Sequence, residues 1–247
     1  VIAESHAHLD NFTNEFNYFI QSTKNKYFLK WITISEYLKK GYSERGAVLK
    51  KIHVLPDAVD FDFFANKGTS TVNPFEKYTG KNIVYSGHLY DYKGIPSLLE
   101  AAKKLKGITI HLVGGLKVDI ERHRNYCKRE NISNVVFHGM KKHQEVPNYL
   151  WNADLLLLTH SLNHPSANWT SPVKLAEYLA SKKPVLVADI PALRDWLDNT
   201  SVFFYKPDNS NSLSQEINHV LTLEQSEIQT KTTKAFQIAA NWSYINR

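Results

Sequence analysis

Cysteine is almost absent from this sequence of 247 residues. The single cysteine, Cys127, excludes an internal disulfide framework and any zinc site built on paired cysteines. Apolar runs are short as well, with the longest near 155–158, whereas spanning a bilayer takes about 20 residues. The sequence also lacks a signal-peptide pattern. We therefore expect a globular, cytoplasmic protein.

Charge of one sign is not concentrated anywhere in the sequence. The formal net charge is +6 and the sequence pI is about 9.1, yet Lys and Arg are spread along the chain without a basic block. Spread positive charge indicates either a solvated surface or attraction to phosphorylated small molecules or anionic lipid. Nucleic acid is not an expected partner, whereas peripheral contact with the cytoplasmic face of an anionic membrane stays open.

Familiar cofactor and metal motifs are missing too. The glycines in 113–115 are not followed by a third glycine at dinucleotide-binding spacing, and no Walker loop is present. His138, His143 and His164 do not form a metal-ligand pattern with carboxylates on one helix face. We expect neither a cofactor nor a metal.

What the sequence does contain, from about residue 81 onward, is an alternation of β-rich runs with helical patterns. This alternation predicts an α/β fold with a parallel sheet covered on both faces. Pro96 suits the first turn of the helix that follows the first of these strands. The predicted strands are 82–86, 108–113, 135–138, 154–158, 184–188 and 201–205.

The first part of the chain shows the same alternation of strand and helix patterns over fewer residues. It predicts short strands at 1–4, 31–35 and 51–55, with a helix at 36–45. Pro56, Asp57 and the polar run 66–73 then indicate a linker. The expected domains are 1–70, the last part of one α/β domain; 71–223, a complete second α/β domain; and 224–247, a helical tail that includes Trp242 and Tyr244.

The stretch 170–180 is the most informative for chemistry. Ser171 is a good N-cap and Pro172 a good first helical residue, and the free N–H groups of such a helix start suit a phosphate. Lys174 would neutralise phosphate charge, and Glu177, about 7.5 Å farther along the axis than Pro172, would meet sugar hydroxyls. The alternative is an ordinary amphipathic helix whose Lys174 and Glu177 face water.

A second candidate site is the loop 86–94, which follows the strand ending at residue 86. Gly87 permits a tight turn with close backbone approach, and His88 and Lys93 add positive charge at the carboxyl end of a strand, where open α/β sheets bind ligands. The alternative is a loop whose glycine and lysine serve turn geometry and solubility only.

Together these segments resemble the retaining family-4 glycosyltransferases of the GT-B fold, in which two Rossmann-like domains face each other across a cleft. The motifs that carry the resemblance span nearly the whole chain in family order. They are Glu4-Ser5-His6, 32–38, 54–60, 85–89 with Lys93-Gly94, 137–140, Ala153-Asp154, and 171–177 continuing to 184–189.

The resemblance implies a role for each matching residue. Lys93 would bind the donor diphosphate, with His88 at the place where many relatives have arginine. Glu177 would hold the ribose hydroxyls, and the backbone around Met140 would meet the base. His6 would be the catalytic histidine that reaches across the cleft to the transferred sugar.

Two alternatives qualify these roles. His6 is either that histidine or a surface or core histidine beside His8. Trp169 stands where many relatives have a glutamate that contacts the transferred sugar, so its ring either stacks on the sugar or packs against the neighbouring loop. Nearby polar residues would replace the lost hydrogen bonds, namely Asn163, His164, Ser166 and Asn168.

The expected reaction is metal-independent transfer of a glycosyl group, expected to be a hexosyl group, with retention. The donor would be a nucleotide diphosphate sugar, and the acceptor a glycan, a lipid-linked molecule or a small molecule. Residue 1 is Val and the single Met is Met140, so we expect a missing N-terminal segment or a partner chain, and little transfer by these residues alone. The alternatives are a nucleotide-sugar epimerase of the same fold and a non-catalytic nucleotide-sugar-binding subunit.

Overall fold

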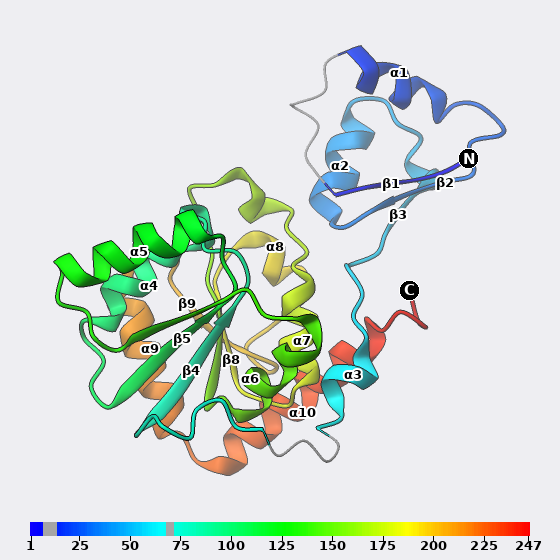
Figure 1. Ribbon diagram of the computed structural model, residues 1–247. Coiled ribbons are helices and arrows are strands. Elements are labelled where there is room, and N and C mark those ends of the chain that lie inside the picture. Colours follow the sequence, from blue (N-terminus) through cyan, green and yellow to red (C-terminus); the bar gives the residue numbers. More distant parts are fainter. Residues whose placement is uncertain (7–13, 68–71) are drawn as a thin grey trace.

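The computed structural model describes residues 1–6, 14–67 and 72–247, and it contains two α/β units that lie next to each other (Figure 1). His8 and residues 68–71 of the expected linker lie outside the described residues. The first unit has a parallel sheet of order β1-β2-β3. Its elements are β1 (Ile2–Ser5), α1 (Asn14–Ser22), β2 (Lys30–Thr33), α2 (Glu36–Glu44) and β3 (Ile52–Val54).

The second unit has a six-stranded, all-parallel sheet of order β6-β5-β4-β7-β8-β9. Its strands are β4 (Lys81–Ser86), β5 (Ile108–Val113), β6 (Val135–Gly139), β7 (Leu155–Leu158), β8 (Val185–Ala188) and β9 (Phe203–Tyr205). Its helices are α4 (Ile95–Ala102), α5 (Lys117–Arg129), α6 (Val146–Asn152), α7 (Val173–Ala180), α8 (Pro191–Arg194), α9 (Ser210–Thr222) and α10 (Gln225–Asn241). This strand order is that of a doubly wound Rossmann-like sheet.

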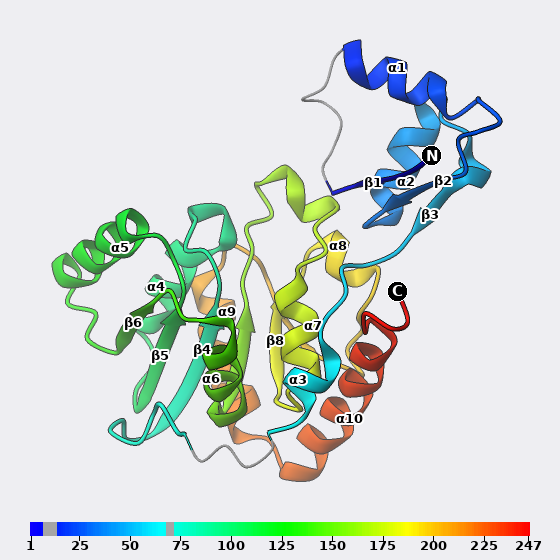
Figure 2. The same ribbon diagram turned by 45° about the vertical axis from the view of Figure 1, so that its right-hand side comes forward.

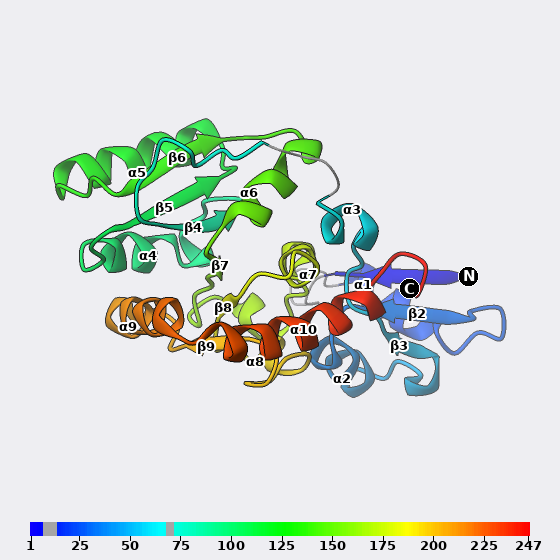
Figure 3. The ribbon, with the colours of Figure 1, turned by 90° about the horizontal axis from the view of Figure 1, so that it is seen from below.

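Burial on both faces explains why the central strands are apolar throughout. Every residue of β7 and of β8 is buried, as expected for parallel strands covered by helices on each side. Figure 3 shows α4 and α9 on one face of the sheet and α6 and α7 on the other. The predicted strands are therefore confirmed, with ends that differ by no more than two residues.

Two helices of the first 70 residues, α1 and α3, were not predicted from the sequence. Residues 61–65, within the range assigned to the end of the first domain, form α3 (Phe61–Ala65), and Asp60 caps it by accepting from the N–H of Phe63 at 3.3 Å. The side chain of Phe64 is buried in the core of the second unit, and α3 packs on α7. This short helix therefore anchors the connecting segment to the second unit.

The C-terminal helix α10 packs along α7, and the chain then reaches the segment that connects the two units (Figure 2). The N–H of Val59 donates to the Trp242 carbonyl at 2.9 Å, and the N–H of Tyr244 donates to the Val59 carbonyl at 3.2 Å. The tail therefore fixes the connection by backbone pairing. Across the described ranges, no helix combines the length and apolar character that crossing a membrane requires.

Candidate nucleotide-sugar site

The start of α7 differs from the sequence prediction by one residue. The structure has Pro172 as the N-cap, with an extended backbone (φ −77°, ψ 117°), and the helix begins at Val173. The prediction of Ser171 as the N-cap was therefore wrong. Its hydroxyl instead accepts the N–H of Asp57, 114 residues earlier in the chain, at 2.8 Å.

This shift has a chemical consequence for α7. Pro172 offers no side-chain hydrogen bond to the helix, so no described side chain caps the first N–H groups. The positive end of the helix dipole therefore remains available to an anion. The proposed role of Ser171 and Pro172 in donor binding now depends on backbone placement rather than on capping.

Lys174 and Glu177 are not fully solvated, so the alternative in which both side chains simply face water does not hold. Both side chains are half-buried. Burial, aided by the positive charge of Lys93, lowers the pKa of Lys174 to about 7. Burial likewise raises the pKa of Glu177 above its usual value. Groups with such displaced pKa values are typical of functional sites.

Lys174 is held against the loop that follows β4. Its Nζ donates to the Tyr85 hydroxyl at 3.1 Å, and that hydroxyl donates to the His88 carbonyl at 2.7 Å. Gly87 has φ +135°, and a Cβ there would lie 2.3 Å from Lys174 Nζ. Glycine is therefore required for the close approach of this lysine, a reason that the sequence alone did not reveal.

A pocket of about 140 Å³ brings together three of the predicted residues, Gly87, His88 and Met140. His88 is exposed, and its ring stacks on Tyr90 with 4.9 Å between ring centroids. Met140 is exposed at the rim. A second pocket, of only about 10 Å³, is lined by Lys93, Pro172 and Lys174. Lys174 contacts Gly87 of the first pocket and lines the second, so it lies between them.

Lys93 is also half-buried, and burial lowers its pKa. Its Nζ lies over the Tyr92 ring at 4.9 Å from the centroid. Because the charge of Lys93 also lowers the pKa of Lys174, the two cations repel each other. An anion of two negative charges between them would relieve this repulsion. The site is therefore suited to a diphosphate.

A histidine cluster beside Lys93 was only partly anticipated. The Ser166 hydroxyl lies 2.7 Å from His164 Nδ1 and 3.1 Å from His160 Nε2, and the Tyr92 ring stacks on His164 at 4.1 Å. Burial lowers the pKa of His160 to about 4. Sequence analysis missed His160 and Tyr92, although His160 follows β7 by two residues at the carboxyl edge of the sheet.

The other predicted sugar contacts in this loop have partners close by. The Asn163 amide donates to Asp208 at 3.4 Å, and the Asn168 amide donates to the Pro165 carbonyl at 3.4 Å. Trp169 reaches the first unit, where its ring stacks on Tyr37 of α2 with 6.0 Å between centroids. The ring therefore packs across the two units, and its predicted contact with a sugar stays a prediction.

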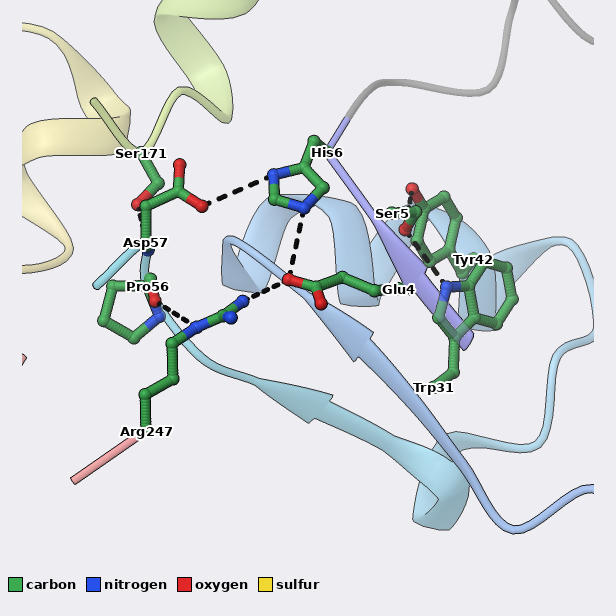
Figure 4. A network of polar contacts seen from close by, with 9 residues as sticks. All are labelled: Glu4, Ser5, His6, Trp31, Tyr42, Pro56, Asp57, Ser171 and Arg247. Carbon is green, nitrogen blue, oxygen red and sulfur yellow. Dashed lines mark hydrogen bonds and ion pairs between the residues drawn. The ribbon is translucent and has the colours of Figure 1, made fainter. Parts of the chain in front are cut away.

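His6 follows β1 and faces the second unit. It belongs to a network of polar residues that includes Glu4, Asp57 and Arg247 (Figure 4). Its Nε2 lies 3.1 Å from Glu4 Oε1, and its Nδ1 lies 3.4 Å from Asp57 Oδ1. Its side chain is 54% exposed, so a ligand can reach it. His6 is thus a surface histidine with two carboxylates close by, and its catalytic role stays a prediction.

Two adjacent α/β units, one with a doubly wound parallel sheet, give this chain the GT-B fold. The chain belongs to the family of glycosyl transferases group 1, whose sequence profile matches residues 80–223. The three-stranded first sheet represents only part of a Rossmann-like domain in this chain.

Relatives agree with this assignment. The chain is 25% identical over 244 residues to a processive diacylglycerol alpha-glucosyltransferase of Acholeplasma laidlawii, covering 92% of this chain and 71% of the relative. It is similar in structure to Anabaena HepE in complex with UDP and glucose (TM-score 0.79, 17% identity, 99% of this chain and 68% of that chain). It is also similar to a glycosyltransferase of Rickettsia africae (TM-score 0.80, 20% identity, 98% and 67%).

Proposed function

We propose that this glycosyltransferase transfers a hexosyl group from a nucleoside diphosphate sugar, with retention at the anomeric carbon and without a bound metal, as family 4 enzymes do. The observation that carries this proposal is the pair of half-buried lysines, Lys93 and Lys174, beside the uncapped start of α7. Fixed positive groups of this kind stabilise the charge that develops on a leaving diphosphate. They do the work that a divalent cation performs elsewhere.

The two pockets suggest how the donor lies. The diphosphate would bind between Lys93, Lys174 and the first N–H groups of α7, and His88 would contribute from the rim of the larger pocket. The base would enter that pocket near Met140, and Glu177 would accept hydrogen bonds from the ribose. The transferred sugar would then point toward His6 and the loop that carries Trp169.

A lipid acceptor suits this chain, because the Acholeplasma relative is named as a diacylglycerol glucosyltransferase. The first unit exposes Tyr18, Tyr27 and Leu29 at its surface, and also Lys26 and Lys30. Such a surface would favour the peripheral membrane association that the charge of the chain suggests. Sedimentation with vesicles containing anionic lipid, against vesicles of neutral lipid, tests this association.

The decisive experiment incubates the full-length protein with labelled UDP-, GDP- and ADP-sugars, with and without EDTA, and with candidate lipid and glycan acceptors. We expect a glycosylated product whose anomeric configuration matches that of the donor, formed equally well in EDTA. Conversion of the donor sugar to an epimer would instead identify an epimerase. Tight binding with neither product would identify a non-catalytic subunit, and loss of product in EDTA would contradict metal independence.

A further inference from the structure

Both ring nitrogens of His6 face a carboxylate, but the two carboxylates are not equivalent (Figure 4). Glu4, which faces Nε2, also pairs with Arg247, and this pairing lowers the pKa of Glu4. If His6 turns away, Glu4 therefore keeps a cationic partner. Among the described residues, the carboxylate of Asp57 has an ion-pair contact only with His6.

Asp57 is the more buried of the two carboxylates. Its side chain is 18% exposed, against 35% for Glu4, and burial raises its pKa. Its N–H donates to the Ser171 hydroxyl at 2.8 Å, and Arg247 Nε donates to the carbonyl of the preceding Pro56 at 2.9 Å. Its backbone is thus tied to the residue before the N-cap of α7, while its side chain faces His6 of the first unit.

We propose that Asp57 is a positioning residue for His6, and this inference rests on the proposed function. The Asp57 carboxylate accepts the Nδ1–H of His6 and so selects the tautomer in which Nε2 is a free acceptor. Nε2 then leaves Glu4, which Arg247 retains, and accepts a hydroxyl of the transferred sugar. The hydrogen bond from the Asp57 N–H to the Ser171 hydroxyl holds Asp57 beside the start of α7.

In this arrangement the protonation state of His6 decides whether Nε2 can accept a hydrogen bond. The charged groups that face the ring are Glu4 and Asp57, with Arg247 behind Glu4. A protonated ring donates to both carboxylates and has no acceptor to offer. A neutral ring keeps its Nδ1–H on Asp57 and frees Nε2.

The tautomer can be measured without any acceptor. Imidazole ¹⁵N spectra of the whole protein, with the His6 signal assigned through its loss in His6→Asn, should show the Nδ1–H form for the neutral ring. In Asp57→Ala the signal should shift toward the Nε2–H form. Asp62→Asn, which changes an exposed carboxylate five residues away, should leave the signal unchanged. An Nε2–H form in the parent, or no change in Asp57→Ala, overturns the proposal.

A double-mutant cycle on transfer separates this inference from the proposed function. We expect Asp57→Ala to lower kcat by about 10- to 100-fold, the range for the partners that orient metal-ligating histidines, while the Kd of the nucleoside diphosphate stays unchanged. In the His6→Ala background the same substitution should have no further effect. Equal losses in both backgrounds overturn the role of Asp57, whereas a parent that binds no nucleotide sugar contradicts the proposed function itself.

Discussion

The two units of this chain are stabilised in different ways. In the second unit, six strands are covered on both faces, and β7 and β8 contain only buried apolar residues. In the first unit, three short strands alternate in burial, and four of the nine buried core residues are aromatic. Trp31 stacks on Tyr42 with 4.2 Å between ring centroids.

Polar groups complete this aromatic core (Figure 4). Trp31 Nε1 donates to the Ser5 hydroxyl at 3.0 Å, and that hydroxyl lies 2.8 Å from the Tyr42 hydroxyl. Contacts between a few large side chains thus stabilise the first unit, whereas contacts among many smaller apolar side chains stabilise the second. The six-stranded sheet holds the residues of the anion site, and the smaller unit places His6 on the side that faces the second unit. The expectations below test this division, from the largest effect to the smallest.

Removing one aromatic ring should unfold the first unit while the second stays folded. Trp31 is almost fully buried, and Trp31→Ala should lower the free energy of unfolding of this unit by about 3–5 kcal/mol. Urea unfolding followed by circular dichroism should then show two separate transitions, and nucleotide binding should persist. Leu156→Ala, in the second unit, should instead impair nucleotide binding. A single shared transition in Trp31→Ala would show that the units fold together.

Nucleotide affinity should fall as pH rises above 7. Burial and Lys93 lower the pKa of Lys174 to about 7, so the free site loses its charge above that pH, whereas a bound diphosphate favours the charged form. The Kd should weaken roughly fivefold, or by about 1 kcal/mol, between pH 7 and pH 8. Calorimetry in buffers of different ionisation heat should show proton uptake on binding. Lys174→Arg should flatten the profile, and a flat profile in the parent would contradict the assignment.

Glu177 should discriminate ribose from deoxyribose. Glu177→Ala should weaken binding of the ribonucleotide by about 0.5–1.5 kcal/mol, the usual net value of a hydrogen bond, and should affect the 2′-deoxy analogue less. Calorimetry with the two nucleotides makes the comparison, and Glu121→Ala, an exposed carboxylate on α5, serves as the control. If both nucleotides lose affinity equally, Glu177 does not contact the ribose.

Trp169 should produce the smallest effect. Trp169→Ala should weaken binding of the nucleotide sugar by about 0.5–1 kcal/mol, the scale of one aromatic contact, with little change for the nucleoside diphosphate. Tyr37→Leu removes the ring on which Trp169 stacks but leaves Trp169 itself in place. If Tyr37→Leu reproduces the whole effect of Trp169→Ala, then Trp169 acts through packing between the units.

Local patterns in the sequence predicted the second unit well, because its strands are apolar and its helices begin at clear signals such as Pro96. Sequence reasoning failed where a partner lies far away in the chain. The hydroxyl of Ser171 suits a helix cap locally, yet it binds Asp57, 114 residues earlier. Trp169 likewise stacks on Tyr37, which no local pattern reveals.

In the candidate site too, local patterns identified residues, whereas contacts between distant parts of the chain determine their environment. Lys93, Lys174 and Glu177 were identified from their spacing and from the family resemblance, but their half-burial and displaced pKa values depend on how β4, β7 and α7 meet. Asp57 was placed in a linker because it follows a proline. Only the fold shows that this linker brings a carboxylate to His6.

The central claim, that the second unit binds a nucleoside diphosphate between Lys93 and the start of α7, is tested most directly by calorimetric titration of UDP, GDP and ADP into three proteins. These are the parent, Lys93→Ala and the control Lys128→Ala, which removes an exposed lysine of α5. We expect one diphosphate to bind the parent and Lys128→Ala equally. Lys93→Ala should bind it more weakly by about 1.5–3 kcal/mol, the range for hydrogen bonds to charged groups. Equal binding by all three proteins, or no binding by the parent, would contradict the claim.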